Sequence, residues 1–172
     1  MSGISLSIGD VVHYGAHGVC CVSGVERMDL GAGKKNYYLM QPVAGGSIQL
    51  YLPQDADPER VHLRKVLSAE EIYALVEQEI PNHMDWVNDS KVRKELASKT
   101  LRGGDTAELI RMVKVLHGHA QELPQGKSLP LSDLEQMRSA EKQLYNEFCF
   151  VLDITKEQVL PFILGEIKVS KK

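Results

Sequence analysis

The spacing of hydrophobic positions changes near residue 66 and divides the chain into two parts. Before that point, β-branched and aromatic residues lie between Gly and Pro residues, which is typical of short strands and tight turns. We expect strands at residues 11–14, 19–26, 37–43 and 48–52. Such strands in so short a span predict a small, strongly bent sheet or partial barrel. Ile48, Leu50 and Leu52 alternate with polar positions and are expected on its buried face.

After Leu67 the hydrophobic period becomes that of α-helices. Ser68 with Glu71 predicts a capping box, in which each side chain accepts from a backbone N–H at the helix start. The same device recurs at Ser132 with Glu135 and Thr155 with Gln158, and more loosely at Asp105 with Glu108. We expect helices near residues 68–80, 84–101, 105–120, 132–150 and 155–167. The sequence therefore predicts an α+β protein, with a β domain at 1–66 and a bundle of about five helices at 67–172.

The composition is that of an ordinary soluble protein, with 43% hydrophobic and 25% charged residues. No stretch approaches the roughly 18 apolar residues of a membrane helix, and the first residues lack the pattern of a signal peptide. Two of the three cysteines are adjacent, which is a poor framework for disulfides. We therefore expect a cytoplasmic protein without a membrane partner.

The charge is unevenly placed, although the net charge is only −3. Residues 66–90 hold six acids and no base, whereas residues 91–114 hold seven bases and three acids. A basic segment is thus embedded in a mildly acidic chain. Contact with nucleic-acid phosphates depends on local charge, so this segment is a candidate for DNA binding.

Enzyme chemistry finds little support in the sequence. His13, His17, Cys20 and Cys21 are zinc-ligand types, but adjacent cysteines on a strand point to opposite faces and do not converge on one ion. The glycine-rich residues 31–35 lack the spacing of a phosphate loop and precede a strand, so we interpret them as a hairpin turn. There is no G-x-S-x-G motif. We expect neither a catalytic site, nor a metal, nor a cofactor.

Trp86 is the single tryptophan of the chain and lies among polar residues just before the basic segment. One interpretation is that it anchors the core where a helix begins. Another is that its ring stacks on bases or wedges between them while the following cations hold phosphates. The polar neighbours and the following cations favour contact with DNA, but the residues alone leave both interpretations open.

Several motifs follow one another in a fixed order. Residues 8–19 (IGDVVHYGAHGV) pair a G-D-x-V-x-Y strand with an H-G turn and a further strand, and residues 37–39 (YYL) and 48–53 (IQLYLP) follow. The second part carries Asp85-Trp86, Gly104-Asp105 and Leu131-Ser132-x-x-Glu135. This ordered set resembles the CarD-type regulators, also called the CdnL family, whose N-terminal domain is shared with transcription-repair coupling factor. The resemblance covers nearly the whole chain.

The resemblance implies a Tudor-like, SH3-like β domain that docks on the β subunit of RNA polymerase, joined to a compact helical domain. It implies that Trp86 wedges into the minor groove at the upstream edge of the transcription bubble, and that Lys91 is a basic position just after it. Many family members carry a basic pair where this chain has Asn88 and Asp89. Phosphate contact is therefore expected to involve Arg93, Lys94, Lys99 and Arg102.

The polymerase-facing strands also depart from the family pattern. Relatives place arginines there at positions that match Met28 and Tyr51 of this chain. We expect polymerase contact from Arg27, Met28, Gln49 and Tyr51, and a larger share of the affinity from strand-edge pairing. The leading hypothesis is a polymerase-bound regulator of transcription initiation with weak, largely sequence-independent DNA contact. The alternatives are an interaction module that has lost DNA contact, and an enzyme that uses His17 and Cys20.

Overall fold

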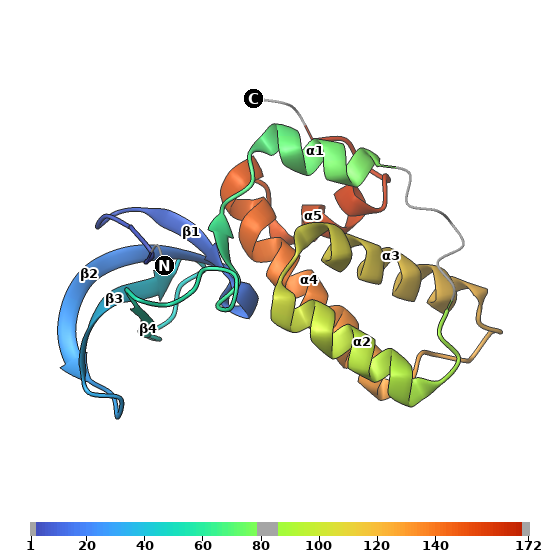
Figure 1. Ribbon diagram of the computed structural model, residues 1–172. Coiled ribbons are helices and arrows are strands. Elements are labelled where there is room, and N and C mark those ends of the chain that lie inside the picture. The colour runs from blue at the N-terminus through green and yellow to red at the C-terminus, as the bar shows by residue number, and fades with distance from the viewer. Residues whose placement is uncertain (1–2, 79–85, 170–172) are drawn as a thin grey trace. The chain divides into compact units, whose positions relative to one another are not determined.

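The computed structural model describes residues 3–78 and 86–169. The chain divides after Val66 into two compact units, an N-terminal β domain and a C-terminal helical domain (Figure 1). The prediction of a β domain followed by a helical part is confirmed, and the described residues contain five α-helices. Within the described residues, no helix has both the length and the apolar character needed to cross a membrane.

The β domain is one antiparallel sheet with the strand order β4-β3-β2-β1-β5. Its strands are β1 (Val11–Tyr14), β2 (Val19–Asp29), β3 (Lys34–Pro42), β4 (Leu50–Pro53) and β5 (Leu63–Lys65). A short 3-10 turn, η1 (Gly15–His17), joins β1 to β2. The two edge strands are therefore β4 and β5, and both are short.

The glycine-rich residues 31–35 form the turn between β2 and β3, as the sequence predicts. Gly31 and Gly33 have φ values of 101° and 82°, a backbone region that is strained for other residues. The long hairpin presents Cys20, Val22 and Met40 to the core, where each is at most 1% exposed. Burial of these apolar side chains stabilises the bent sheet.

One predicted strand starts later than expected, and one observed strand was not predicted. The strand expected at residues 48–52 begins at Leu50, and Ile48 lies outside it with 64% of its surface exposed. Leu52 is fully buried as expected. Strand β5 was not predicted, because a three-residue strand with two basic residues shows no alternation of apolar and polar positions.

The helical domain contains α1 (Ala69–Glu77), α2 (Ser90–Gly103), α3 (Thr106–Glu122), α4 (Leu131–Leu152) and α5 (Lys156–Ile163). The capping box of Ser68 and Glu71 is confirmed, with both reciprocal hydrogen bonds present at 2.8 and 3.1 Å. The Gln158 side chain likewise accepts from the N–H of Thr155, and the Asp105 side chain accepts from the N–H of Glu108. These bonds satisfy backbone groups that a helix leaves open at its start.

Two predicted helix starts are wrong. The helix expected from residue 84 begins at Ser90, because the Asp89 carboxylate accepts from the N–H groups of Lys91 and Val92 and fixes the start there. Residues 84 and 85 lie outside the described residues. Helix α4 begins at Leu131, after Pro130 in an extended conformation, so Ser132 lies inside the first turn and does not cap the helix.

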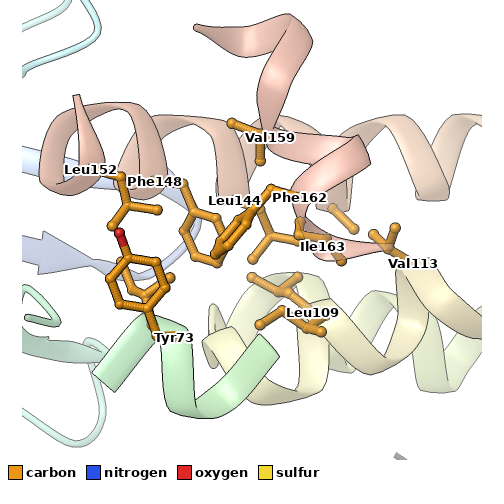
Figure 2. Close-up of a cluster of buried hydrophobic side chains, with 12 residues drawn as sticks. Tyr73, Leu109, Val113, Leu144, Phe148, Leu152, Val159, Phe162 and Ile163 are labelled. Carbon is orange, nitrogen blue, oxygen red and sulfur yellow. The ribbon is translucent and has the colours of Figure 1, made fainter. Parts of the chain in front are cut away.

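Helix α4 forms the centre of the helical domain, and its Leu144 and Phe148 pack against Leu109 of α3 and Phe162 of α5 (Figure 2). The same helix also binds α2 through polar contacts. The Gln143 side chain donates to the backbone carbonyl of Leu101, and the Gln136 side chain donates to the backbone carbonyl of Lys94. These two hydrogen bonds hold α2 against α4 along the length of α2, although most residues of α2 are polar.

Candidate polymerase and nucleic-acid interfaces

The outer face of the sheet brings two of the predicted polymerase contacts together. Met28 pairs with Lys35 on β3, and Tyr51 pairs with Leu39 four residues further along the same strand. Because side chains alternate between the faces of a strand, Met28 and Tyr51 lie on one face. Tyr51 is 43% exposed and belongs to the edge strand β4. An exposed aromatic side chain on an edge strand is a suitable contact for a protein partner.

The other two predicted contacts lie elsewhere. Arg27 pairs with Asn36, three residues from Leu39 on β3, and so projects from the opposite face to Tyr51. The Arg27 side chain is exposed. Gln49 precedes β4 and is half-buried, and its side-chain nitrogen is buried with no hydrogen-bond partner among the described residues. The four predicted polymerase contacts therefore do not lie on one surface of the β domain.

Trp86 lies three residues before the capping Asp89 and is half-buried. Its ring stacks on the ring of His119 from α3, with the ring centres 3.6 Å apart and the planes 4° from parallel. The guanidinium carbon of Arg93 lies 4.1 Å from the centre of the Trp86 ring. Trp86 is thus neither a fully buried core residue nor a freely exposed side chain.

Arg93 makes internal contacts, although it belongs to the basic segment. Its Nε and Nη2 atoms donate to the two carboxylate oxygens of Asp133 on α4, both at 2.8 Å. Its Nη1 atom donates to the backbone carbonyl of Val87 at 2.6 Å. The hydrogen bonds to Asp133 raise the pKa of Arg93, so the guanidinium stays charged. With three nitrogens engaged, Arg93 has little capacity left for a phosphate group.

The remaining predicted DNA contacts on α2 are exposed side chains, namely Lys91, Lys94, Lys99 and Arg102. In the middle of α3, burial lowers the pKa of Lys114, whose Nζ atom donates to the backbone carbonyl of Val76. Lys114 therefore has an internal partner. Exposed cations on α2 follow directly after Trp86, and other exposed cations include Arg111 on α3 and Lys142 on α4.

The sequence analysis missed His119 and Asp133 as residues of this site. An acidic residue in the first turn of a helix is ordinarily explained by the helix dipole, so Asp133 gave no signal of a partner 40 residues away. His119 lies in α3 outside the apolar stripe, and its stacking depends on a tertiary contact. Neither role follows from local pattern.

The groups considered for metal binding or catalysis do not converge. His13 and Cys20 are buried, whereas Cys21 on the adjacent position is half-buried and faces the other side of β2. Burial, followed by the nearby Cys21, raises the pKa of Cys20 to about 11. Among residues 3–78 and 86–169, no group of three or more His, Cys, Asp or Glu side chains could hold a metal ion.

The structure combines a β domain that exposes Tyr51 on an edge strand with a helical domain that carries a half-exposed tryptophan and a cationic helix. Residues 6–67 match the family model of the CarD-like/TRCF RID domain. The N-terminal domain is therefore a CarD-like RNA polymerase-interacting domain. The match ends at the junction of the two domains, and no curated protein matches the chain.

Proposed function

We propose that this protein regulates transcription initiation by binding the β subunit of bacterial RNA polymerase and by stabilising the promoter open complex, rather than by catalysing a reaction. The observation that carries the proposal is the RNA polymerase-interacting domain at residues 6–67, followed by a helical domain that presents Trp86 beside exposed cations. Because RNA polymerase works in the bacterial cytoplasm, the proposal also assigns the protein to that compartment.

Trp86 acts as a wedge at the upstream edge of the transcription bubble. Inserting an apolar side chain between base pairs costs about a few kcal/mol per unstacked step. That cost is lowest where the duplex is already opening, so the wedge favours the open complex over the closed one. A differential affinity of about 1.4 kcal/mol shifts this equilibrium roughly tenfold.

The DNA contact alone is weak. Four exposed cations on α2 bind only a few phosphates, and their contribution falls steeply with salt concentration. Binding to polymerase supplies a high local concentration of the helical domain at the promoter. The two contacts together give an occupancy that neither gives alone.

Docking on polymerase uses the β4 edge of the sheet. The open backbone groups of β4 supply hydrogen bonds to a partner strand, and Tyr51 and Met28 supply side-chain contacts from one face. Arg27 lies on the opposite face and contributes less. A Tyr51→Glu substitution places a charge on this surface and is expected to weaken the binding of polymerase, whereas Arg60→Gln, at an exposed position between β4 and β5, makes the same change in net charge and serves as the control.

The decisive experiment measures the lifetime of promoter complexes after a competitor challenge, with no factor, wild type and Trp86→Ala. The proposal predicts that wild type lengthens the lifetime and that Trp86→Ala binds polymerase normally without doing so. Thermal unfolding of both proteins shows whether the variant is folded. A folded variant that prolongs the lifetime as well as wild type contradicts the wedge.

A second candidate function is an interaction module that binds polymerase without DNA contact. It is supported by the internal role of Arg93 and by Asn88 and Asp89, which stand where a basic pair is expected. This function predicts that Trp86→Ala lowers stability and leaves promoter opening unchanged. The same lifetime measurement therefore separates the two functions.

A further inference from the structure

Two side chains cover the faces of the Trp86 ring. The His119 ring lies parallel to it at 3.6 Å, and the Arg93 guanidinium carbon lies 4.1 Å from its centre. Two flat groups this close to one ring centre would overlap if they lay on the same side, so they occupy opposite faces. The half-buried indole therefore keeps its accessible surface at its edge.

Close packing alone does not fix the indole in this position. A groove of about 250 Å³ lies beside it, lined by apolar side chains that include Leu96, Met112 and Val115. A side chain in a fully packed interior has no such space next to it. The orientation of Trp86 therefore depends on its two specific contacts.

The Arg93 contact is itself held in place by Asp133. Two parallel hydrogen bonds at 2.8 Å fix the plane of the guanidinium, and Asp133 is only 3% exposed. The third hydrogen bond, to the carbonyl of Val87, fastens the backbone residue next to Trp86. Bidentate geometry of this kind gives orientation as well as binding energy.

We propose that Asp133 and His119 are positioning residues for Trp86, and that they present the indole edge-on to nucleic acid with both faces closed. This inference rests on the proposed function and specifies how the ring contacts its ligand. An exposed ring edge can wedge into the minor groove where base pairs separate at a duplex fork, whereas stacking on an unpaired base requires an open ring face. The site is therefore selective for a duplex junction over a single strand. Holding the ring in advance also reduces the freedom lost on binding.

The first test uses the single tryptophan of the 172-residue chain as its own reporter, without DNA. His119→Ala and Asp133→Asn are expected to shift the emission to longer wavelength and to increase the acrylamide quenching rate constant, after correction for fluorescence lifetime. His119→Phe keeps a ring on that face and is expected to restore the wild-type values. Glu141→Gln, which alters a hydrogen-bonded contact between α4 and His117 of α3, is the control and is expected to change neither value. Unchanged fluorescence in folded His119→Ala overturns the proposal.

The second test measures promoter-complex lifetime and binding to single-stranded DNA with the same variants. His119→Ala is expected to lose most of the lifetime gain and to bind single strands more tightly than wild type, and His119→Phe is expected to behave like wild type. If Trp86→Ala shortens the lifetime while His119→Ala changes fluorescence but not lifetime, the functional role of positioning is overturned. If Trp86→Ala has no effect, the proposed function fails, and fluorescence alone then decides whether Asp133 and His119 hold the ring. His119→Ala decides the question if Asp133→Asn does not fold.

Discussion

Arg93 on α2 and Asp133 on α4, which lie 40 residues apart in the chain, form a bidentate ion pair with both nitrogen–oxygen distances at 2.8 Å. The pair joins the start of α2 to the start of α4 beneath Trp86. It also explains why the basic segment is less available to DNA than its charge indicates. Two of its cations, Arg93 and Lys114, have partners within the protein, and the exposed ones remain for phosphates.

Removing Arg93 is expected to destabilise the protein strongly. Arg93→Met leaves the carboxylate of Asp133, which is 3% exposed, without its partner. Breaking a buried ion pair by removing one member costs about 3–5 kcal/mol. Urea denaturation of Arg93→Met, Asp133→Leu and the double variant measures the effect.

The double variant is the control for this prediction. With both charges replaced by apolar groups, no ion is left unpaired, so its free energy of unfolding is expected to lie closer to wild type than that of Arg93→Met. Equal losses in the double variant and Arg93→Met would show that the contacts of Arg93 to Trp86 and Val87, and not the ion pair, dominate.

The exposed cations of α2 are expected to determine the salt dependence of DNA binding. Replacing Lys91, Lys94 or Lys99 with Gln removes one phosphate contact each. The slope of log affinity against log salt is then expected to fall by about 0.9 per contact on duplex DNA. Fluorescence anisotropy with fork-junction DNA over a range of salt concentrations measures it. Lys142 is exposed on α4, so Lys142→Gln makes the same change in charge away from α2 and is the control. An equal fall of the slope in Lys142→Gln would mean that DNA binding is not localised to α2.

Much of the fold follows from the sequence because it rests on local rules. The period of apolar residues locates the helices, and the Ser68 capping box and the glycines of the β2–β3 turn locate two boundaries. The start of α2 was predicted wrongly because Asp89 was not recognised as the residue that caps this helix. Asp89 was considered for its charge toward DNA, whereas its structural role is that of a cap.

The site was predictable only in part. The exposed cations follow from charge, since long polar side chains remain in solvent. The contacts that decide how Trp86 is presented join α2, α3 and α4, and such tertiary contacts leave no trace in local spacing. Arg93 differs from its basic neighbours only because Asp133 and Trp86 lie on its side of the helix. Likewise, the register of strands β2, β3 and β4 places Tyr51 and Arg27 on opposite faces of the sheet.

Glu147 is expected to stabilise the start of the helical domain. This side chain is 1% exposed and accepts from the hydroxyl of Thr106 at 2.8 Å and from the N–H of Leu67 at 3.2 Å. Glu147→Ala removes these acceptors, and each buried donor left unsatisfied costs about 1–3 kcal/mol. Thermal unfolding measures the loss, and hydrogen exchange of the Leu67 amide is expected to accelerate. An unchanged exchange rate at Leu67 would contradict the assigned bond.

Cys20 is expected to be unreactive in the folded protein. With its pKa raised to about 11 by burial, about one thiol in a thousand is ionised at pH 8, and the thiolate is the reactive form. Labelling with iodoacetamide at pH 8, followed by mass spectrometry, should modify half-buried Cys21 before Cys20, and urea should expose both. Rapid labelling of Cys20 in the native protein would instead revive the hypothesis of an enzyme that uses this thiol.

Asp89 offers a way to separate helix capping from charge. Asp89→Asn keeps a side-chain oxygen that accepts from the N–H groups at the start of α2, so the free energy of unfolding should change little. The same change removes a negative charge three residues after Trp86, and affinity for fork-junction DNA is expected to rise. Asp89→Ala removes the charge and also the cap, at a cost of about 1 kcal/mol. If Asp89→Asn leaves DNA affinity unchanged at low salt while the α2 lysines still matter, phosphates do not approach the start of α2, and the wedge geometry at Trp86 is wrong.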